Sequence, residues 1–527
     1  MNENPQKLPP LLDEIMNQNM LGIVAAGLLA ATVWTANAAS RSWIGGSGAW
    51  DDTTAANWSP AGVITNTDTV NISQAGVTIA YTATNLTGQG LSDCHLMNVG
   101  TGTTTFALDN TDFLPIRLVL SVGRYSSNAC TFNLTGNALL TLYGGGSGLI
   151  LGGSGGAGPF VFNQSGGIFS NGIGSGSLVY IFSNATYNLS GGSYIANRNL
   201  DLHGGAFLQS GGTLTIADSY GMTLNAFSTF VLSTGTFNQG GAAILMGTNA
   251  SVNWTGGSLL GQMGKIKTTG PDASWTMHGG TSTVNKSGNT SASKDSLFLV
   301  PSSTIQGYGA IQDARFGASS PATFDNSGRV IANGYGMDRT FDLSRFGQTT
   351  ANPMITNTTD NTGSNGWFAI NQGRLLLPAI AVAAGSSATN WGESIADTSL
   401  DLVNSARLSF TGATAGNLTG TLYAVDCPAV PSGLRKPVGI WSFGGVTCTA
   451  AVVTFRYDNA AAAAQGVAED DLRVWKYNGA NWVNVTDTRD TTAKTITSQS
   501  ITSWPKATTF FAVANKPPAK GTMMVVR

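Results

Sequence analysis

A short phrase recurs through residues 131–284 and constrains the fold more than any other feature of this 527-residue chain. The phrase consists of an aromatic or aliphatic residue, polar residues, Ser or Thr, and then Gly-Gly. Its clearest copies are Phe162–Gly167, Tyr187–Gly192 and Phe207–Gly212, with looser copies at Phe132–Gly136, Phe230–Gly235, Val252–Gly257 and Trp275–Gly280. Most copies are about 20–25 residues apart, a period that indicates stacked structural repeats rather than one closed globule.

The runs between these glycines are short and favour β-strands. Leu214–Ile216, Thr229–Leu232 and Ala243–Met246 are typical, and Gly, Asn and Ser end such runs. The period is too short for strand-helix-strand units, which need roughly 30 residues, and it fits one coil of a parallel β-helix. About a dozen coils spaced about 4.8 Å apart would form a rod on the order of 60 Å long. A β-sandwich or a disordered Gly-rich segment is the alternative, and the regular apolar runs argue against disorder.

Charged side chains are scarce in the repeats. Between residues 124 and 265 the ionisable side chains, Tyr and Cys aside, are Arg198, Asp201, His203 and Asp218. Stacked coils place equivalent side chains above one another, so charges would repel whereas Asn, Ser and Thr can form hydrogen-bonded ladders. The formal net charge of -2 gives no indication of a nucleic-acid partner.

The first 38 residues have the pattern of an export leader. Leu21–Val33 is an apolar run too short to span a bilayer comfortably, and Ala36–Ala38 fits a signal-peptidase site. The segment before it lacks the usual positive charge, which suggests a later start at Met16 or Met20; an uncleaved anchor is the alternative. We therefore predict a secreted protein at the cell surface with no integral membrane segment after cleavage.

The rest of the chain divides into segments that differ in composition and in the length of their apolar runs. Residues 39–120 contain Trp43, Trp50 and Trp58, which we interpret as an N-terminal cap with the first irregular coils, because an open solenoid end needs covering; an aromatic sugar-binding platform is the alternative. Residues 121–395 are the predicted parallel β-helix. From residue 396 to residue 514 longer alternating runs, with a hairpin signal at Asn478-Gly479, predict an antiparallel β-sandwich, followed by a tail at 515–527. The predicted fold class is thus all-β.

Three motifs within residues 43–380 carry a resemblance to a known group of proteins. They are the opening at Trp43–Trp58, the Gly-Gly coils, and the segments Thr304–Ile311 and Phe324–Gly334. Together they resemble exported bacterial β-helix repeat surface proteins, both autotransporter-passenger-like proteins and sorted surface proteins. We expect neither a C-terminal membrane barrel nor a Pro-Glu-Pro sorting tail, so the resemblance implies a surface or matrix role but no route of attachment.

The sequence contains few candidate catalytic or ligand-binding residues. Glycoside hydrolysis needs two carboxyl groups at a defined separation, and Asp201 and Asp218, with His203 beside the first, are the best candidates. Two Asp residues that share a solenoid face by chance are the commoner explanation. No metal-ligand spacing and no phosphate-binding loop stands out, so we predict no enzyme activity, no metal and no cofactor.

Four cysteines suit an exported protein with two disulfides. Cys427 and Cys448 flank a predicted hairpin, and Cys94 paired with Cys130 would join the cap to the start of the rod. This pairing is one of three, and buried free thiols are the alternative.

The expected function is that of an exported, non-catalytic structural protein of the cell surface or extracellular matrix that associates with itself as a filament, layer or matrix. An adhesin that binds surface or matrix carbohydrate through exposed aromatic residues such as Trp254 and Trp275 is the alternative. A polysaccharide lyase or hydrolase comes third.

Overall fold

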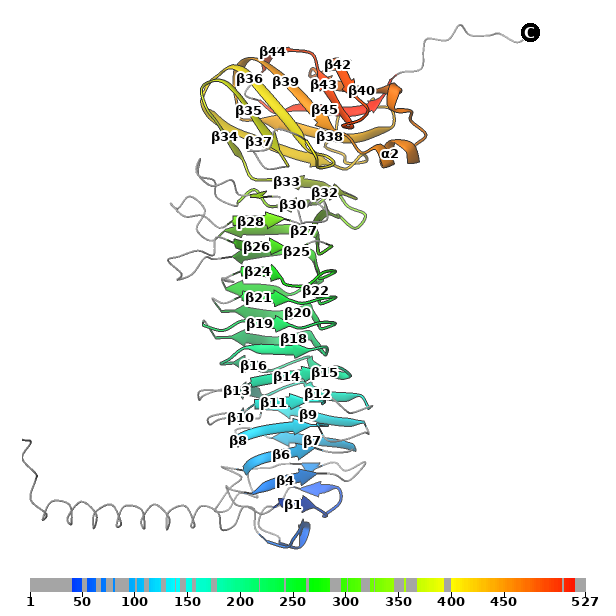
Figure 1. Cartoon of the computed structure of the whole chain (residues 1–527). Helices are drawn as coiled ribbons and strands as arrows, with labels where there is room; N and C mark the ends of the chain where they lie inside the picture. Colours follow the sequence, from blue (N-terminus) through cyan, green and yellow to red (C-terminus); the bar gives the residue numbers. More distant parts are fainter. Residues whose placement is uncertain are drawn as a thin grey trace, which may run out of the picture.

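The computed structural model is all-β, with most strands stacked along one long axis and a second group of strands at one end (Figure 1). It describes residues 40–516 except for internal gaps at 50–54, 63–67, 73–78, 81–93, 100–101, 109–112, 125–128, 138, 143–147, 154–157, 172–177, 218, 241–242, 262–264, 285–294, 301, 314–322, 327, 346–354, 357–366, 393–399 and 505–506. The predicted leader and tail therefore lie outside the described residues. Within the described ranges no helix combines the length and apolar character needed to cross a membrane.

The stacked strands form three parallel ladders. The first contains β1 (Ser40–Trp43), β4 (Thr69–Ile72), β6 (Cys94–Val99), β8 (Phe113–Val122), β11 (Gly148–Leu151), β14 (Leu178–Phe182), β17 (Leu200–His203), β19 (Met222–Leu224), β21 (Ala243–Met246), β24 (Lys265–Thr268), β26 (Asp295–Leu299), β28 (Thr323–Asn326) and β31 (Ile355–Thr356). The second contains β7 (Gly102–Leu108), β9 (Cys130–Gly136), β12 (Phe160–Gln164), β15 (Ala185–Leu189), β18 (Ala206–Ile216), β20 (Thr229–Gln239), β22 (Ser251–Trp254), β25 (Ser274–Val284), β27 (Thr304–Asp313), β29 (Arg329–Ala332) and β32 (Trp367–Ile370).

The third ladder begins with the first half of β8 and continues through β10 (Leu139–Leu142), β13 (Ile168–Asn171), β16 (Ser193–Ala196), the second halves of β18 and β20, β23 (Ser258–Gly261), the second halves of β25 and β27, β30 (Thr340–Asp342) and β33 (Arg374–Leu376). The chain thus visits the ladders in turn and returns to each one strand spacing further along. Such parallel sheets are compatible with a parallel β-helix.

The first residues of four consecutive repeat phrases point inward, and their rings form an aromatic stack. The rings of Phe132, Phe162, Tyr187 and Phe207 follow one another at centroid distances of 4.7, 4.6 and 4.8 Å. These side chains are fully buried. Parallel pairing in register places like rings above each other, so the phrase builds a continuous aromatic core.

Outward positions of the same strands carry amides and hydroxyls. Asn188 donates to Asn163 and Asn163 donates to Asn133, each at 2.8 Å between Nδ2 and Oδ1. The predicted amide ladder is therefore confirmed for these three coils.

The Gly-Gly pair of the phrase forms a corner that larger residues would not fit. A Cβ on Gly191 would lie 2.4 Å from the Ser165 carbonyl oxygen, so the first glycine permits close approach of the preceding coil. Gly192 has φ of +70°, which L side chains rarely adopt. The repeated glycines therefore mark corners between the second and third ladders.

At two of these corners a buried glutamine forms hydrogen bonds to main-chain carbonyl groups. Gln164 donates from Nε2 to the carbonyl of Gly167 at 3.3 Å and to that of Ser193 in the next coil at 2.9 Å. Gln209 repeats this arrangement with Gly212 and Thr236. The polar residue in the phrase thus joins successive coils.

Two tryptophans pack against each other at the first coil. β3 (Trp58–Ser59), which follows the 3-10 helix η1 (Ala55–Asn57), pairs antiparallel with β1, and the Trp43 and Trp58 rings meet edge to face at 5.1 Å. β2 (Gly48–Ala49) and β5 (Ile79–Ala80) pair beside them. Both tryptophans are buried, as the sequence predicts, whereas Trp50 lies outside the described residues.

The C-terminal strands form antiparallel sheets. One contains β34 (Ile380–Val382), β37 (Gly416–Tyr423), β38 (Pro437–Gly444), β45 (Thr509–Asn515), β40 (Leu472–Tyr477) and β41 (Trp482–Asn484). The other contains β35 (Gly385–Trp391), β36 (Ala406–Ala413), β39 (Cys448–Arg456), β42 (Thr486–Asp490), β43 (Thr495–Ser498) and β44 (Ile501–Trp504). The helix α2 (Asn459–Ala464) and the 3-10 helix η3 (Glu469–Asp471) connect strands of the two sheets.

The two antiparallel sheets face each other across an apolar core. Trp441 of β38 contacts Phe455 of β39 at 4.5 Å between ring centroids, and Phe443 contacts Trp391 edge to face at 5.7 Å. The predicted boundary at residue 396 falls between β35 and β36, which pair with each other.

The predicted disulfides are not formed. Cys427 and Cys448 are buried free thiols. Cys427 lies between β37 and β38 of one antiparallel sheet, whereas Cys448 begins β39 of the other, so the two cysteines do not flank one hairpin. Cys130 is also a buried thiol, and burial raises its pKa to about 12 although a backbone hydrogen bond from Gly123 opposes the shift. The Cys94 side chain lies outside the described residues.

Candidate functional site

The catalytic candidate Asp201 lies on the outer side of β17. Its neighbours along the first ladder are Tyr180 of β14 and Thr223 of β19. Burial raises the pKa of the Asp201 carboxyl group, while a hydrogen bond with Thr223 and the proximity of His203 act in the opposite direction. The raised pKa is the kind of shift that marks catalytic acids, although structural carboxyl groups show it too.

Asp201 does not meet a second carboxyl group at its ladder position. The described residues in line with it are Ile150, Tyr180, Thr223 and Leu245, and none of these is acidic. Asp218, the predicted partner, lies outside the described residues. His203 packs its ring against Tyr180 and Phe182, at 4.9 and 5.4 Å between centroids. The described residues therefore contain no carboxyl pair at this position.

The predicted ligand-contacting tryptophans are not exposed. Trp254 is 4% exposed and Trp275 is 2% exposed, so neither presents a ring face to a ligand. Trp275 aligns with Val252 and, through it, with Phe230, all of which occupy the inward starting position of the phrase. The expected exposure was wrong because both residues belong to the core set of the repeat.

An outward aromatic cluster lies near the end of the stack. The His278 ring is 4.0 Å from the Tyr335 ring, and the Arg339 guanidinium group lies 4.0 Å above the Tyr308 ring. Burial and the charge of Arg339 lower the pKa of His278. The partners of His278 come from later coils, so no local sequence pattern marks this cluster.

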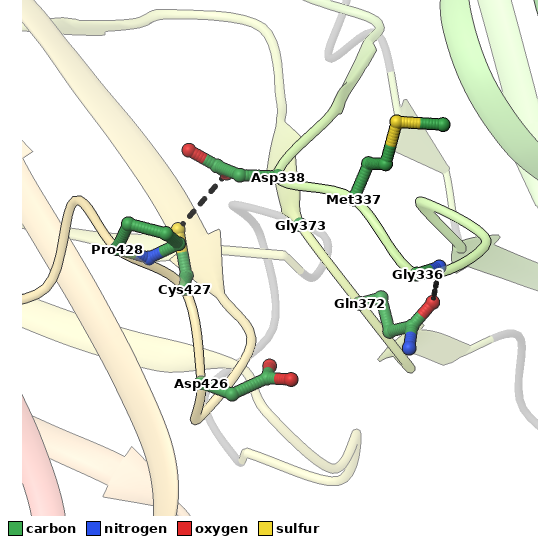
Figure 2. A pocket seen from close by; sticks show the side chains of 8 residues that line it. All are labelled: Gly336, Met337, Asp338, Gln372, Gly373, Asp426, Cys427 and Pro428. Atoms are coloured by element: carbon green, nitrogen blue, oxygen red, sulfur yellow. Dashed lines mark hydrogen bonds between the residues drawn. The ribbon is translucent and has the colours of Figure 1, made fainter.

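A small pocket marks the boundary between the stacked ladders and the antiparallel sheets (Figure 2). It has a volume of about 130 Å³ and is lined by Gly336, Met337, Asp338, Gln372, Gly373, Asp426, Cys427 and Pro428. Figure 2 shows Cys427 facing Asp338, with the Gln372 side chain beside the Gly336 amide from which it accepts a hydrogen bond.

Asp338 connects three segments at this pocket. Its Oδ1 accepts a hydrogen bond from the Cys427 Sγ at 3.1 Å, and its Oδ2 forms an ion pair with Nη2 of Arg374 at 2.9 Å. Arg374 begins β33, whose antiparallel partner is β37, and the Ala424 amide donates to the Gly373 carbonyl at 2.9 Å. Both side-chain and main-chain contacts therefore connect the stacked ladders to the antiparallel sheets.

The chemistry of this pocket favours a structural joint over a reactive site. Burial is the main cause that raises the pKa of Cys427, and the Asp338 carboxylate adds to it, so the thiol stays protonated and donates. The pocket is also smaller than the roughly 300–1,000 Å³ typical of small-molecule sites. Among the described residues no group of three His, Cys, Asp or Glu side chains is placed to hold a metal ion.

Comparisons of the chain with protein-family models, with curated proteins and with solved structures gave no match. The class of protein therefore has to be argued from the fold and these sites.

Proposed function

We propose that this chain is an exported, non-catalytic structural protein that displays its C-terminal sheets on a stiff stem at the cell surface or in the extracellular matrix. In this proposal residues 40–376 are a parallel β-helix, called the stem below, and residues 380–515 are a β-sandwich, called the head.

The observation that carries the proposal is the uninterrupted pairing from stem to head. The third ladder ends at β33, which pairs with β37 through Arg374↔Tyr423, Leu375↔Leu422 and Leu376↔Thr421. β37 in turn pairs with β38 in the head. A hydrogen-bonded ladder that crosses the boundary resists bending, because any hinge there would break several main-chain hydrogen bonds at once.

The outer surface of the stem also suits exposure outside a cell. Half-buried Thr and Asn side chains alternate with the buried core in β9 and β15, as the burial patterns of these strands show. The outward Asn133, Asn163 and Asn188 lie one above another in successive coils, so this row is polar and carries no like charges. The resemblance to exported bacterial repeat proteins and the leader-like first 38 residues agree with this location.

Self-association remains a prediction, and the fold restricts its form. At the C-terminal end of the third ladder β37 already pairs with β33, so end-to-end addition of a second copy there would have to displace it. Lateral packing of the flat outer faces leaves this pairing intact. We therefore favour side-by-side association over head-to-tail filaments.

The proposal is tested by locating the protein in the cells that make it. Antibodies against the head should label intact, unpermeabilised cells, and electron micrographs of the released protein should show single rods or laterally packed rods. Labelling that requires permeabilisation would contradict the proposed location. Rods joined end to end would contradict the proposed mode of association.

A further inference from the structure

The head contains a cleft on the sheet formed by β45, β40 and β41. Its volume is about 420 Å³, within the roughly 300–1,000 Å³ range of small-molecule sites. The loop before β38, the β40–β41 hairpin and the end of β45 line it through Ser432, Gly433, Leu434, Arg435, Trp475, Ala480, Asn481, Trp482 and Asn515.

The walls of the cleft are held in place by hydrogen bonds. The Trp482 indole donates to the carbonyls of Pro431 and Ser432, both at 3.1 Å, which ties the hairpin to the loop. The Asn478 side chain accepts from the amides of Ala480 and Asn481 and fixes the turn. The Asn515 amide donates to the Arg435 carbonyl at 3.1 Å. The cleft is therefore formed before any ligand arrives.

Two residues of the cleft carry buried polar atoms that lack a hydrogen-bond partner among the residues that the structure describes. They are the Trp475 Nε1, which is a donor, and the Asn515 Oδ1, which is an acceptor. Buried polar atoms are nearly always hydrogen-bonded, so two unpaired ones in one cleft indicate a missing partner. Hydroxyl groups both donate and accept, so a ligand with several hydroxyl groups can supply a partner to each atom.

Two further features define the class of ligand. The indoles of Trp475 and Trp482 are half-buried, so part of each ring surface reaches solvent. The exposed Arg435 forms no ion pair with any described residue, which leaves its guanidinium group available for a carboxylate. We propose that this cleft binds an acidic saccharide, with a sugar ring against an indole, separate hydroxyl groups on Trp475 and Asn515, and the carboxylate on Arg435.

This inference goes beyond the proposed structural function and does not depend on it. The purified chain would bind the saccharide whether or not the protein is displayed on cells, and a displayed stem requires no ligand in the head. The two proposals can therefore fail separately.

The test is calorimetric titration of the full chain with digalacturonate, with neutral galactobiose as the matched probe. We expect digalacturonate to bind and galactobiose to bind at least about tenfold more weakly, because only the acid pairs with Arg435. Arg435→Gln should remove this preference. Equal affinity for both sugars, or no heat from either, would overturn the proposal.

Trp475→Phe separates binding from stability. The substitution removes an unpaired buried donor but keeps a ring, so the unfolding midpoint should stay the same or rise. Binding of digalacturonate should nevertheless weaken about tenfold, the usual effect of losing one hydrogen bond at such a site. Val483→Ala, at the exposed neighbour of Trp482, is the control and should bind like the wild type. Unchanged binding by the Trp475→Phe protein would overturn the assignment.

Discussion

Asp338 accepts a hydrogen bond from the Cys427 thiol at 3.1 Å, and this contact joins two positions 89 residues apart. The same carboxylate forms an ion pair with Arg374 at the start of the last strand of the third ladder. A single acidic side chain thus joins the loop before β30, the strand β33 and the segment after β37. This arrangement supports the proposal that stem and head move as one body.

Replacing Asp338 with Ala should loosen the boundary without unfolding either part. The side chains of Asp338 and Arg374 are both partly exposed, so the expected loss is about 1 kcal/mol in the free energy of unfolding. Hydrogen exchange should accelerate in residues 372–376 and 421–427 and remain unchanged in residues 185–240. Asp426→Ala, at an exposed residue of the same pocket, is the control. Equal exchange in the two variants would argue against a role for Asp338 at the joint.

Gln209 offers a test of how the repeat phrase works. The equivalent positions in the two adjacent coils are Leu189 and Leu232, so leucine fits the space at position 209. Gln209→Leu removes hydrogen bonds to the carbonyls of Gly212 and Thr236 but also removes a buried acceptor, Gln209 Oε1, that has no partner among the described residues. We expect a net loss of about 1 kcal/mol, measured by chemical denaturation. Ser210→Ala, at an exposed neighbour, should change stability by less than about 0.5 kcal/mol.

Gly192 and Gly336 separate steric overlap from backbone strain. Both have positive φ, of +70° and +85°, but a Cβ on Gly192 would lie 2.2 Å from the Gly167 carbonyl oxygen, whereas one on Gly336 would meet nothing within 4 Å. Gly192→Ala should therefore cost roughly 3 kcal/mol and Gly336→Ala about 1 kcal/mol. Thermal unfolding of the two variants measures the difference. Equal costs would show that conformation alone, rather than stacking of coils, requires these glycines.

Asp201 should make the stability of the stem depend on pH. Its pKa in the folded protein is raised above 3.8, so the folded state binds the proton more tightly than the unfolded state. Stability from this group is therefore complete below 3.8 and is lost as the pH rises through the raised pKa. Asp201→Asn should be more stable than the wild type at about pH 7 and equal to it at about pH 3. A catalytic or stabilising carboxylate would instead make the Asn variant less stable or less active at neutral pH.

Much of the structure of the stem can be predicted from the repeat phrase. Its first residue predicts an inward position, its glycines predict corners, and its Asn residues predict the ladder from Asn133 to Asn188 that the structure contains. The same rule places Trp275, the first residue of its copy, in the core. Trp254 lies two residues after Val252, the first residue of its copy, so alternation along the strand turns it inward as well, and the expected exposure of both tryptophans was wrong.

Neither the pocket at the boundary between stem and head nor the cleft in the head could be predicted in this way. Asp338 and Cys427 carry no local pattern, and their contact depends on where β33 meets β37. The cleft combines Arg435, Trp475 and Asn515 from a loop, a strand and a strand end. The error in pairing Cys427 with Cys448 has the same origin, because strands adjacent in sequence belong to different sheets.

Single-particle electron microscopy of the purified chain tests the central claim most directly. The thirteen described strands of the first ladder predict a straight stem of about 60 Å, at about 4.8 Å per strand, with the head fixed at one end. The account predicts one class of particle with a constant angle between stem and head. A compact globule, or a head that takes many angles to the stem, would contradict it.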